Sequence, residues 1–158
     1  MTTQRLGRLE IEVTPGRLTL TGRIDDSSPL GELAPQIPAG DITIDTDGVT
    51  FVNSIGMREW MRLVRALRER GTVTFERVAD VLITQMNLRP EFSGSQVTSF
   101  HAQYVCLSCG AEQAPLVDAV ANAQALRQMQ APKLPCSECG TAMDLADFPE
   151  RYLSLFRS

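Results

Sequence analysis

The sequence of 158 residues predicts an α/β fold: a mixed four- to five-stranded sheet with helices mainly on one face, plus a small zinc-ribbon-like module. Three observations predict it. Strand-like and helical segments alternate between residues 42 and 88, which implies parallel strands joined by crossover helices. Two strand-like segments separated by a tight turn precede them and predict an antiparallel hairpin. Two pairs of cysteines follow, between residues 106 and 139.

We therefore divide the chain at a break in the pattern near residue 93. Residues 1–93 form the α/β part, and residues 94–158 form the four-cysteine part. The β-rich segment 96–105 is open to three interpretations: the last strand of the sheet, the first strand of the cysteine module, or both. In the first case the sheet extends to residue 105.

The composition is that of a globular protein, with 43% hydrophobic and 22% charged residues. Residues 1–93 carry 11 Arg and 13 Asp or Glu, and residues 94–158 carry 4 Lys or Arg and 6 Asp or Glu, so each part has a net charge of −2. This balance disfavours nucleic-acid binding. The first residues lack the apolar core of a signal peptide, and no run approaches the roughly 18 apolar residues of a membrane span. We expect a cytoplasmic protein, in which cysteines are metal ligands more often than disulfides.

The first elements follow from alternation and turn residues. Residues 9–13 alternate apolar and polar side chains and predict a half-buried strand. Thr14, Pro15 and Gly16 predict a turn, and residues 17–24 a second strand. The segment 26–40 contains three prolines, so we expect at most a short helix around residues 30–34.

The central segment, residues 42–70, predicts a short strand at 42–45, a loop with a second β-rich piece at 49–52, and a long amphipathic helix. Asn53 and Ser54 are favourable N-cap residues because their side-chain oxygens accept hydrogen bonds from backbone N–H groups. The predicted buried stripe consists of Met57, Trp60, Met61, Val64 and Leu67. The predicted solvent-facing cations are Arg58, Arg62, Arg65 and Arg68. Residues 73–76 then predict a strand, residues 79–88 a helix, and residues 90–95 a linker.

Two motifs in this part resemble STAS domains, the fold of bacterial anti-sigma-factor antagonists and of sulfate-transporter tails. The run V-T-F-V-N-S-I-G-M at residues 49–57 resembles their signature loop, and L-T-L-T-G-R-I-D at 18–25 resembles their second strand. The resemblance covers roughly residues 5–105. It implies the mixed sheet described above and recognition of a protein partner.

On this pattern Asn53 takes the position of the family's Asp, and Ser54 that of its first Ser. Ile55 lies where the family carries its phosphorylatable Ser or Thr. Because Ile55 has no hydroxyl group, a kinase switch at this position is excluded, and we expect the partner to be bound constitutively. The implied partner-binding loop consists of Asn53, Ser54, Ile55, Gly56, Met57 and Arg58.

The cysteines form two C-x-x-C-G motifs with 26 residues between them. Two residues between ligands let both thiolates of a pair reach one tetrahedral ion. We predict that Cys106, Cys109, Cys136 and Cys139 bind one metal ion, with Zn²⁺ favoured over iron. Redox-active pairs or disulfides are the alternatives. A closed set of four thiolates implies a structural role because it leaves no open coordination position.

The remaining C-terminal features allow two interpretations each. Residues 114–130 are rich in alanine and predict a helix, which packs on the α/β part or binds a partner. His101 is surplus as a fifth metal ligand. The apolar residues near the C-terminus cover the module or the domain junction, or else form an exposed docking tail. These residues are Leu145, Phe148, Tyr152, Leu153, Leu155 and Phe156.

The sequence contains no recognisable pair of nucleophile and base, and His101 is its single histidine. We therefore expect a protein without enzymatic activity. The favoured function is a regulatory or scaffold protein in bacterial signalling, similar to an anti-sigma-factor antagonist, whose partner is a regulatory kinase, an anti-sigma-type protein or a scaffold component. The alternatives are a nucleic-acid-binding zinc-ribbon protein and a STAS-type accessory subunit of a membrane transporter. The sequence leaves the oligomeric state open.

Overall fold

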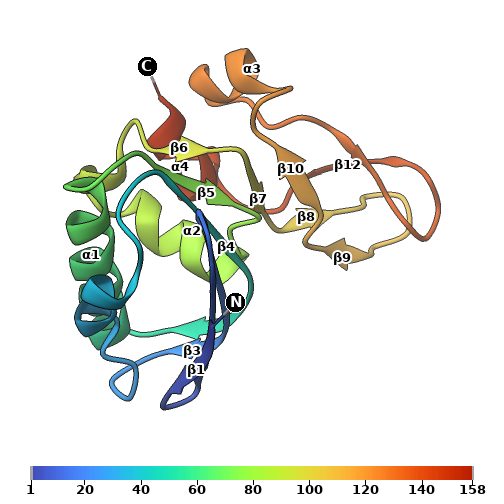
Figure 1. Ribbon diagram of the computed structural model, residues 1–158. Coiled ribbons are helices and arrows are strands. Elements are labelled where there is room, and N and C mark those ends of the chain that lie inside the picture. The colour runs from blue at the N-terminus through green and yellow to red at the C-terminus, as the bar shows by residue number, and fades with distance from the viewer. Residues whose placement is uncertain (1, 158) are drawn as a thin grey trace.

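The structure, a computed structural model, describes residues 2–157 and has an α/β fold with a mixed sheet (Figure 1). Six strands form this sheet in the order β1-β2-β3-β4-β5-β6. They are β1 (Thr2–Leu6), β2 (Leu9–Thr14), β3 (Arg17–Ile24), β4 (Ile42–Val52), β5 (Val73–Glu76) and β6 (Gln96–Val97). Strands β1, β2 and β3 pair in antiparallel fashion, and β3 to β6 pair in parallel. The sheet is therefore larger than the four to five strands predicted.

Strand β1 was not predicted because it carries no buried apolar stripe. Its residues are exposed or half-buried, and the backbone ladder to β2 holds it at the edge of the sheet. The turn between β2 and β3 agrees with the prediction: Thr14 pairs with Arg17, and Gly16 takes a positive φ of 74°. Glycine adopts this conformation without the steric cost that a Cβ atom would impose.

Strand β4 is continuous over Ile42–Val52, whereas the sequence predicted two pieces separated by a loop. The register against β3 shifts between Thr19 and Thr21, so β4 accommodates an extra residue at this point. The carboxylate of Asp45 accepts a hydrogen bond from the Asp47 N–H at 3.0 Å, which satisfies a donor at the irregularity. Polar residues can therefore interrupt the apolar pattern without ending the strand.

One face of the sheet is apolar and is covered by helices (Figure 1). The helical elements of this part are η1 (Leu30–Gln36), α1 (Ser54–Arg68), α2 (Asp80–Asn87) and η2 (Pro90–Phe92). The predicted apolar stripe of α1 is buried, and the Trp60 ring packs against Phe75 of β5 with centroids 5.8 Å apart. Residues 90–95 were expected to be a linker, but Phe92 is buried with its ring edge against Phe75.

The opposite face of the sheet carries an ion-pair cluster around Asp45, whose side chain is buried. Its carboxylate accepts hydrogen bonds from Arg17 at 2.9 Å and from Arg77 at 3.0 Å. Arg17 also pairs with Glu76 at the end of β5. Because the buried carboxylate is both paired and hydrogen-bonded, its desolvation is compensated.

The C-terminal part consists of short strands and helices. Its elements are β7 (Ser99–His101), β8 (Tyr104–Val105), β9 (Glu112–Gln113), β10 (Leu116–Asp118), α3 (Ala123–Arg127), β11 (Leu134–Pro135), β12 (Ala142–Leu145), α4 (Pro149–Leu153) and η3 (Ser154–Phe156). Strand β10 pairs with β7, and four strands form a second sheet in the order β11-β12-β8-β9. The segment 96–105 thus contributes to both parts of the molecule, which was one of the three interpretations.

The helix predicted over residues 114–130 is largely wrong. Residues Leu116–Asp118 form β10, and only Ala123–Arg127 are α-helical. The Asp118 carboxylate accepts the N–H groups of Val120 and Ala121 at 3.0 and 2.9 Å, which fixes a turn where the helix was expected. Alanine propensity is a weak preference, and here pairing with β7 overrides it.

The apolar C-terminal segment packs against the α/β part rather than projecting as a tail. Leu153 and Leu155 are buried, α4 packs on α2, and the Phe156 ring lies 5.2 Å from the ring of Phe100. The Leu155 N–H donates to the Asn87 side chain at 2.8 Å. Of the six apolar residues noted in this segment, only Phe148 is exposed. Buried residues of both parts form one continuous apolar cluster.

Candidate metal centre and the start of helix α1

The four cysteines lie in two turns of the same construction. One turn joins β8 to β9 and the other joins β11 to β12. In each turn the N–H of the glycine that follows the second cysteine donates to the carbonyl of the first cysteine: Gly110 to Cys106 and Gly140 to Cys136, both at 2.8 Å. Both glycines have a φ of 79°, a conformation that glycine adopts without steric cost.

The two turns face each other and bring all four sulfur atoms together. The Sγ atoms lie within 4.8 Å of one another, with Cys106 and Cys139 at 3.5 Å and Cys109 and Cys136 at 3.7 Å. In a tetrahedral site with metal–sulfur bonds of about 2.3 Å, sulfur atoms lie roughly 3.8 Å apart. The observed arrangement therefore fits a single four-coordinate metal ion.

The surroundings of the sulfur atoms shift the pKa values of two of the four thiols in opposite directions. The pKa of Cys139 is lowered to about 6, first because the side chain of Thr141 donates a hydrogen bond to its sulfur. At Cys109 the Ala111 N–H acts in the same direction, but the neighbouring thiols outweigh it and raise the pKa to about 12. Several thiolates placed this close together would repel one another. A bound cation would offset that repulsion, because a coordinating thiol is deprotonated outright.

The cysteine cluster is closed on one side and accessible on the other. Cys106 and Cys136 are buried, whereas Cys109 and Cys139 are exposed. The Glu138 N–H points to the Cys136 sulfur at 3.4 Å. With four sulfur ligands and a backbone donor, the arrangement has the features of a structural site rather than of a catalytic one with an open position.

His101 is engaged elsewhere. Its Nδ1 atom lies 2.8 Å from the Ala114 carbonyl oxygen, and its Nε2 atom lies 2.5 Å from the Asp47 carboxylate. It therefore connects β7 to β4 and to Ala114, the residue that follows β9, and it is not part of the cluster of four cysteines.

The start of α1 is rigidly fixed to the sheet. Asn53 caps the helix by accepting the Gly56 N–H at 2.8 Å, as predicted. Gly56 lies so close to β3 that a Cβ atom there would be 2.0 Å from the Ile24 carbonyl oxygen. Met57 is buried beneath the helix. These three members of the predicted partner-binding loop have structural roles.

The other three members of the loop face outward. Ser54 and Arg58 are exposed, and the side chain of Ile55 has a relative exposure of 49%. The loop therefore separates into a framework of three residues and an accessible surface of three residues, both held by the same short turn.

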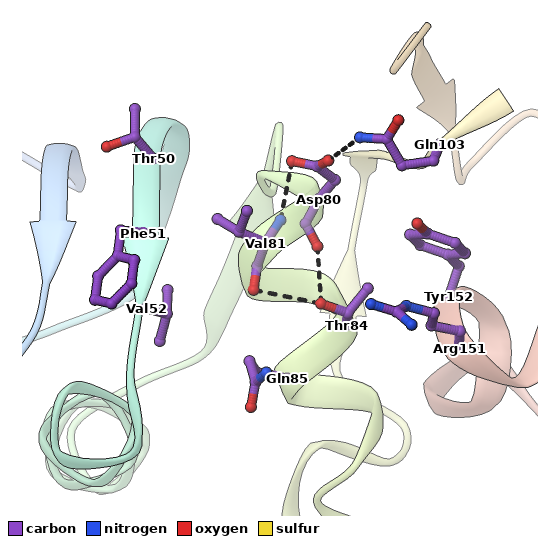
Figure 2. Close-up of a pocket in the computed structure, with 10 residues that line it drawn as sticks. All are labelled: Thr50, Phe51, Val52, Asp80, Val81, Thr84, Gln85, Gln103, Arg151 and Tyr152. Carbon is purple, nitrogen blue, oxygen red and sulfur yellow. Dashed lines mark hydrogen bonds between the residues drawn. The ribbon is translucent and has the colours of Figure 1, made fainter. Parts of the chain in front are cut away.

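A polar pocket of about 380 Å³ lies beside α2, where the two parts of the chain meet (Figure 2). Figure 2 shows Thr50, Phe51 and Val52 of β4 on one side of α2, and Gln103 and Tyr152 on the other. The Gln103 amide donates to the carboxylate of Asp80. Burial raises the pKa of Tyr152. This pocket was not predicted, because its residues come from four separate segments of the chain.

No protein-family model matches this chain, and no match was found among curated proteins or solved structures. The resemblance to STAS domains therefore stays a prediction. No helix within residues 2–157 is both long and apolar enough to cross a membrane.

The structure places the residues of the two predicted sites in two separate parts of the molecule. It brings the four predicted metal ligands into one cluster. It places the six residues of the predicted loop together at the start of α1, on the side of the molecule away from the cysteine turns (Figure 1).

Proposed function

We propose that the protein is a non-enzymatic regulatory or scaffold protein that binds a protein partner through the start of α1. The observation that carries this proposal is the exposed Ile55 side chain on a rigid turn. A fixed aliphatic side chain contributes affinity on burial without a large loss of conformational entropy. Ser54 and Arg58 flank it and supply a hydroxyl group and a guanidinium for polar contacts.

The resemblance of residues 49–57 to the signature loop of STAS domains supports the same surface. The parallel order β3-β4-β5, the opening hairpin and the loop before α1 are features that the resemblance implies. The partner that fits it is a regulatory kinase or anti-sigma-type protein of a bacterial signalling system. With Ile55 in place of a phosphorylatable residue, phosphorylation of this position does not switch binding of the partner on or off.

The metal ion that we propose for the four cysteines is Zn²⁺, which favours tetrahedral thiolate ligation and lacks redox chemistry. Its role is to hold the β8–β9 and β11–β12 turns together. Through these turns it positions the segment that leads to α4, which packs on α2. In this proposal the zinc stabilises the fold, and α1 carries the recognition.

The test is a quantitative pull-down from the native host, with elemental analysis of the same purified protein. Ile55→Asp places a charge at the centre of the proposed surface and is expected to lose the captured partner. Val120→Asp is the matched control, because Val120 is an exposed aliphatic residue in the C-terminal part with a relative exposure of 68%. Both variants should retain about one zinc ion per chain.

A second variant separates the two sites. Cys136→Ser removes one metal ligand and should reduce the zinc content. If the partner is retained by Ile55→Asp but lost by Cys136→Ser, then the zinc module is the docking surface and the proposed surface on α1 is wrong. Retention by Val120→Asp together with loss by Ile55→Asp supports the proposal.

A further inference from the structure

A hollow of about 370 Å³ lies beside the exposed start of α1, and arginine side chains dominate its lining. It is lined by Ser54, Arg58, Met61, Arg65, Arg89 and Glu91. The first four recur at helical spacing along one side of α1, so their side chains share one face. Arg89 and Glu91 come from the connection between α2 and β6 and form the facing wall.

The single acidic residue of the hollow is already engaged. Glu91 makes a bidentate ion pair with Arg65, with nitrogen–oxygen distances of 2.8 and 2.6 Å. The hydrogen bond from Arg65 also lowers the pKa of Glu91, so this carboxylate stays ionised at neutral pH. It neutralises one of the three guanidinium groups in the lining.

The other two guanidinium groups lack acceptors. Within residues 2–157, the side chains of Arg58 and Arg89 make no ion pair and no hydrogen bond. The Nε atom of Arg89 is buried without a partner. A buried donor without an acceptor costs free energy, because its hydration is lost and not replaced. These groups point to an acceptor that the chain itself does not supply.

The charges identify the kind of acceptor. Three arginines and one glutamate give the hollow a net charge of 3 − 1 = +2. A phosphate monoester carries about −1.5 to −2 charges at pH 7 and has three strong acceptor oxygens. Arginine binds such oxygens in a bidentate geometry. The volume leaves room for the side chain that carries the phosphate, and Met61 provides an apolar contact for it.

We infer that this hollow binds a phosphorylated side chain of the partner protein. The inference rests on the proposed function, since it assigns the chemistry of a partner that contacts the start of α1. The protein would then recognise the phosphorylated form of its partner, with Arg58 and Arg89 contacting the phosphate and Arg65 held in place by Glu91.

The test is a titration of the full-length, zinc-containing, ¹⁵N-labelled protein at constant ionic strength, followed by NMR. The probes are inorganic phosphate and two short peptides of the same sequence, one with phosphoserine and one with serine. We expect saturable shifts at the Ser54 amide and at the Nε–H groups of Arg58 and Arg89. The phosphopeptide should bind at least about tenfold more tightly than the serine peptide, since it adds charge-assisted hydrogen bonds.

Variants assign the site. Arg58→Met and Arg89→Met should each weaken phosphopeptide binding by about tenfold. If Arg89→Met destabilises the fold, Arg58→Met still tests the site, because Arg58 is exposed and its replacement should leave the fold intact. Arg62→Met is the matched control. Arg62 lies on the same helix but pairs with Glu59 outside the hollow, so this variant should bind the phosphopeptide with unchanged affinity.

Three results would overturn the inference: equal affinity for both peptides, equal loss of affinity in Arg62→Met, or inorganic phosphate binding as tightly as the phosphopeptide. Competition by a single-stranded oligonucleotide would also overturn it in favour of a nucleic-acid ligand. Failure of this inference can be distinguished from failure of the proposed function, because Ile55 does not line the hollow. If Ile55→Asp loses the partner but the wild-type protein does not bind the phosphopeptide, only the phosphate site is wrong and the proposed surface on α1 is retained.

Discussion

Gly56 determines how closely α1 approaches β3. A Cβ atom at this position would lie 2.0 Å from the Ile24 carbonyl oxygen, a backbone atom that cannot rotate away. We predict that Gly56→Ala lowers the free energy of unfolding by about 1–3 kcal/mol, the typical cost of overpacking. Denaturant unfolding measures it. Gly31→Ala is the control, because the atoms nearest to its added Cβ belong to the Arg62 side chain and lie 3.1 Å away, beyond the 2.0 Å clash at Gly56. Equal effects of the two changes would contradict the steric argument.

Asp25 makes the stability of the fold depend on pH. The Ser27 side chain donates to its carboxylate at 2.6 Å, and this hydrogen bond is the main reason why the pKa of Asp25 is lowered. A lowered pKa contributes stability that is present above the unfolded value of about 3.9 and is lost as pH falls through the folded value.

We therefore predict that Ser27→Ala costs about 1 kcal/mol at pH 7 and that this difference shrinks below about pH 4. Urea unfolding at a series of pH values measures it. Ser93→Ala, an exposed serine without a side-chain hydrogen bond among residues 2–157, should show no such dependence. A cost that stays constant down to pH 2 would assign the effect of Ser27 to something other than Asp25.

Among elements, the paired cysteine turns should depend most on a bound metal. The pKa of Tyr104 in β8 can be used to follow the packing of these turns. Burial of the side chain is the main reason why this pKa is raised to about 12, and the charge of Asp144 contributes in the same direction. Its hydroxyl donates to the Pro132 carbonyl at 2.7 Å, across the second sheet. We predict that chelation of the metal separates the turns and returns the pKa of Tyr104 toward about 10.

Ultraviolet absorbance during an alkaline titration measures this change, and Tyr104→Phe assigns it, since the chain has two tyrosines. Amide exchange should become fast in β8, β11 and β12 after chelation, whereas α1 should stay protected. If the titration curve is the same with and without chelator, the cluster does not hold the second sheet together.

The elements also show what could be predicted from the sequence. Local signals were sufficient for α1, because Asn53, the buried stripe and the arginines all favour the same helix. The C-x-x-C-G spacing likewise predicted the sulfur cluster. Local sequence signals failed where pairing with a distant strand determines the secondary structure. Val117 belongs to β10 because it pairs with Phe100, and helix propensity carries no information about that partner. The arginine hollow was missed because Arg58 and Arg89 are 31 positions apart in the sequence.

For the molecule as a whole, the C-terminal segment is part of the core of the α/β part. Leu155 is buried, and its carbonyl accepts the Gly94 N–H at 3.1 Å. We predict that Leu155→Ala lowers the free energy of unfolding by about 2–5 kcal/mol. Leu88→Ala makes the same chemical change at a side chain with a relative exposure of 75% and should cost less than about 0.5 kcal/mol. Chemical denaturation compares the two variants. A small effect at Leu155 would show that the segment is dispensable.

The late position of these core residues has a consequence for biosynthesis. Tyr152, Leu153 and Leu155 leave the ribosome after every strand of the main sheet and after all four cysteines. Until they emerge, the surface of α2 that α4 covers is exposed to solvent, and a nascent chain in this state offers an apolar surface to chaperones. The two cysteine turns, in contrast, are both synthesised by then, so we expect the proposed metal ion to bind before the core closes.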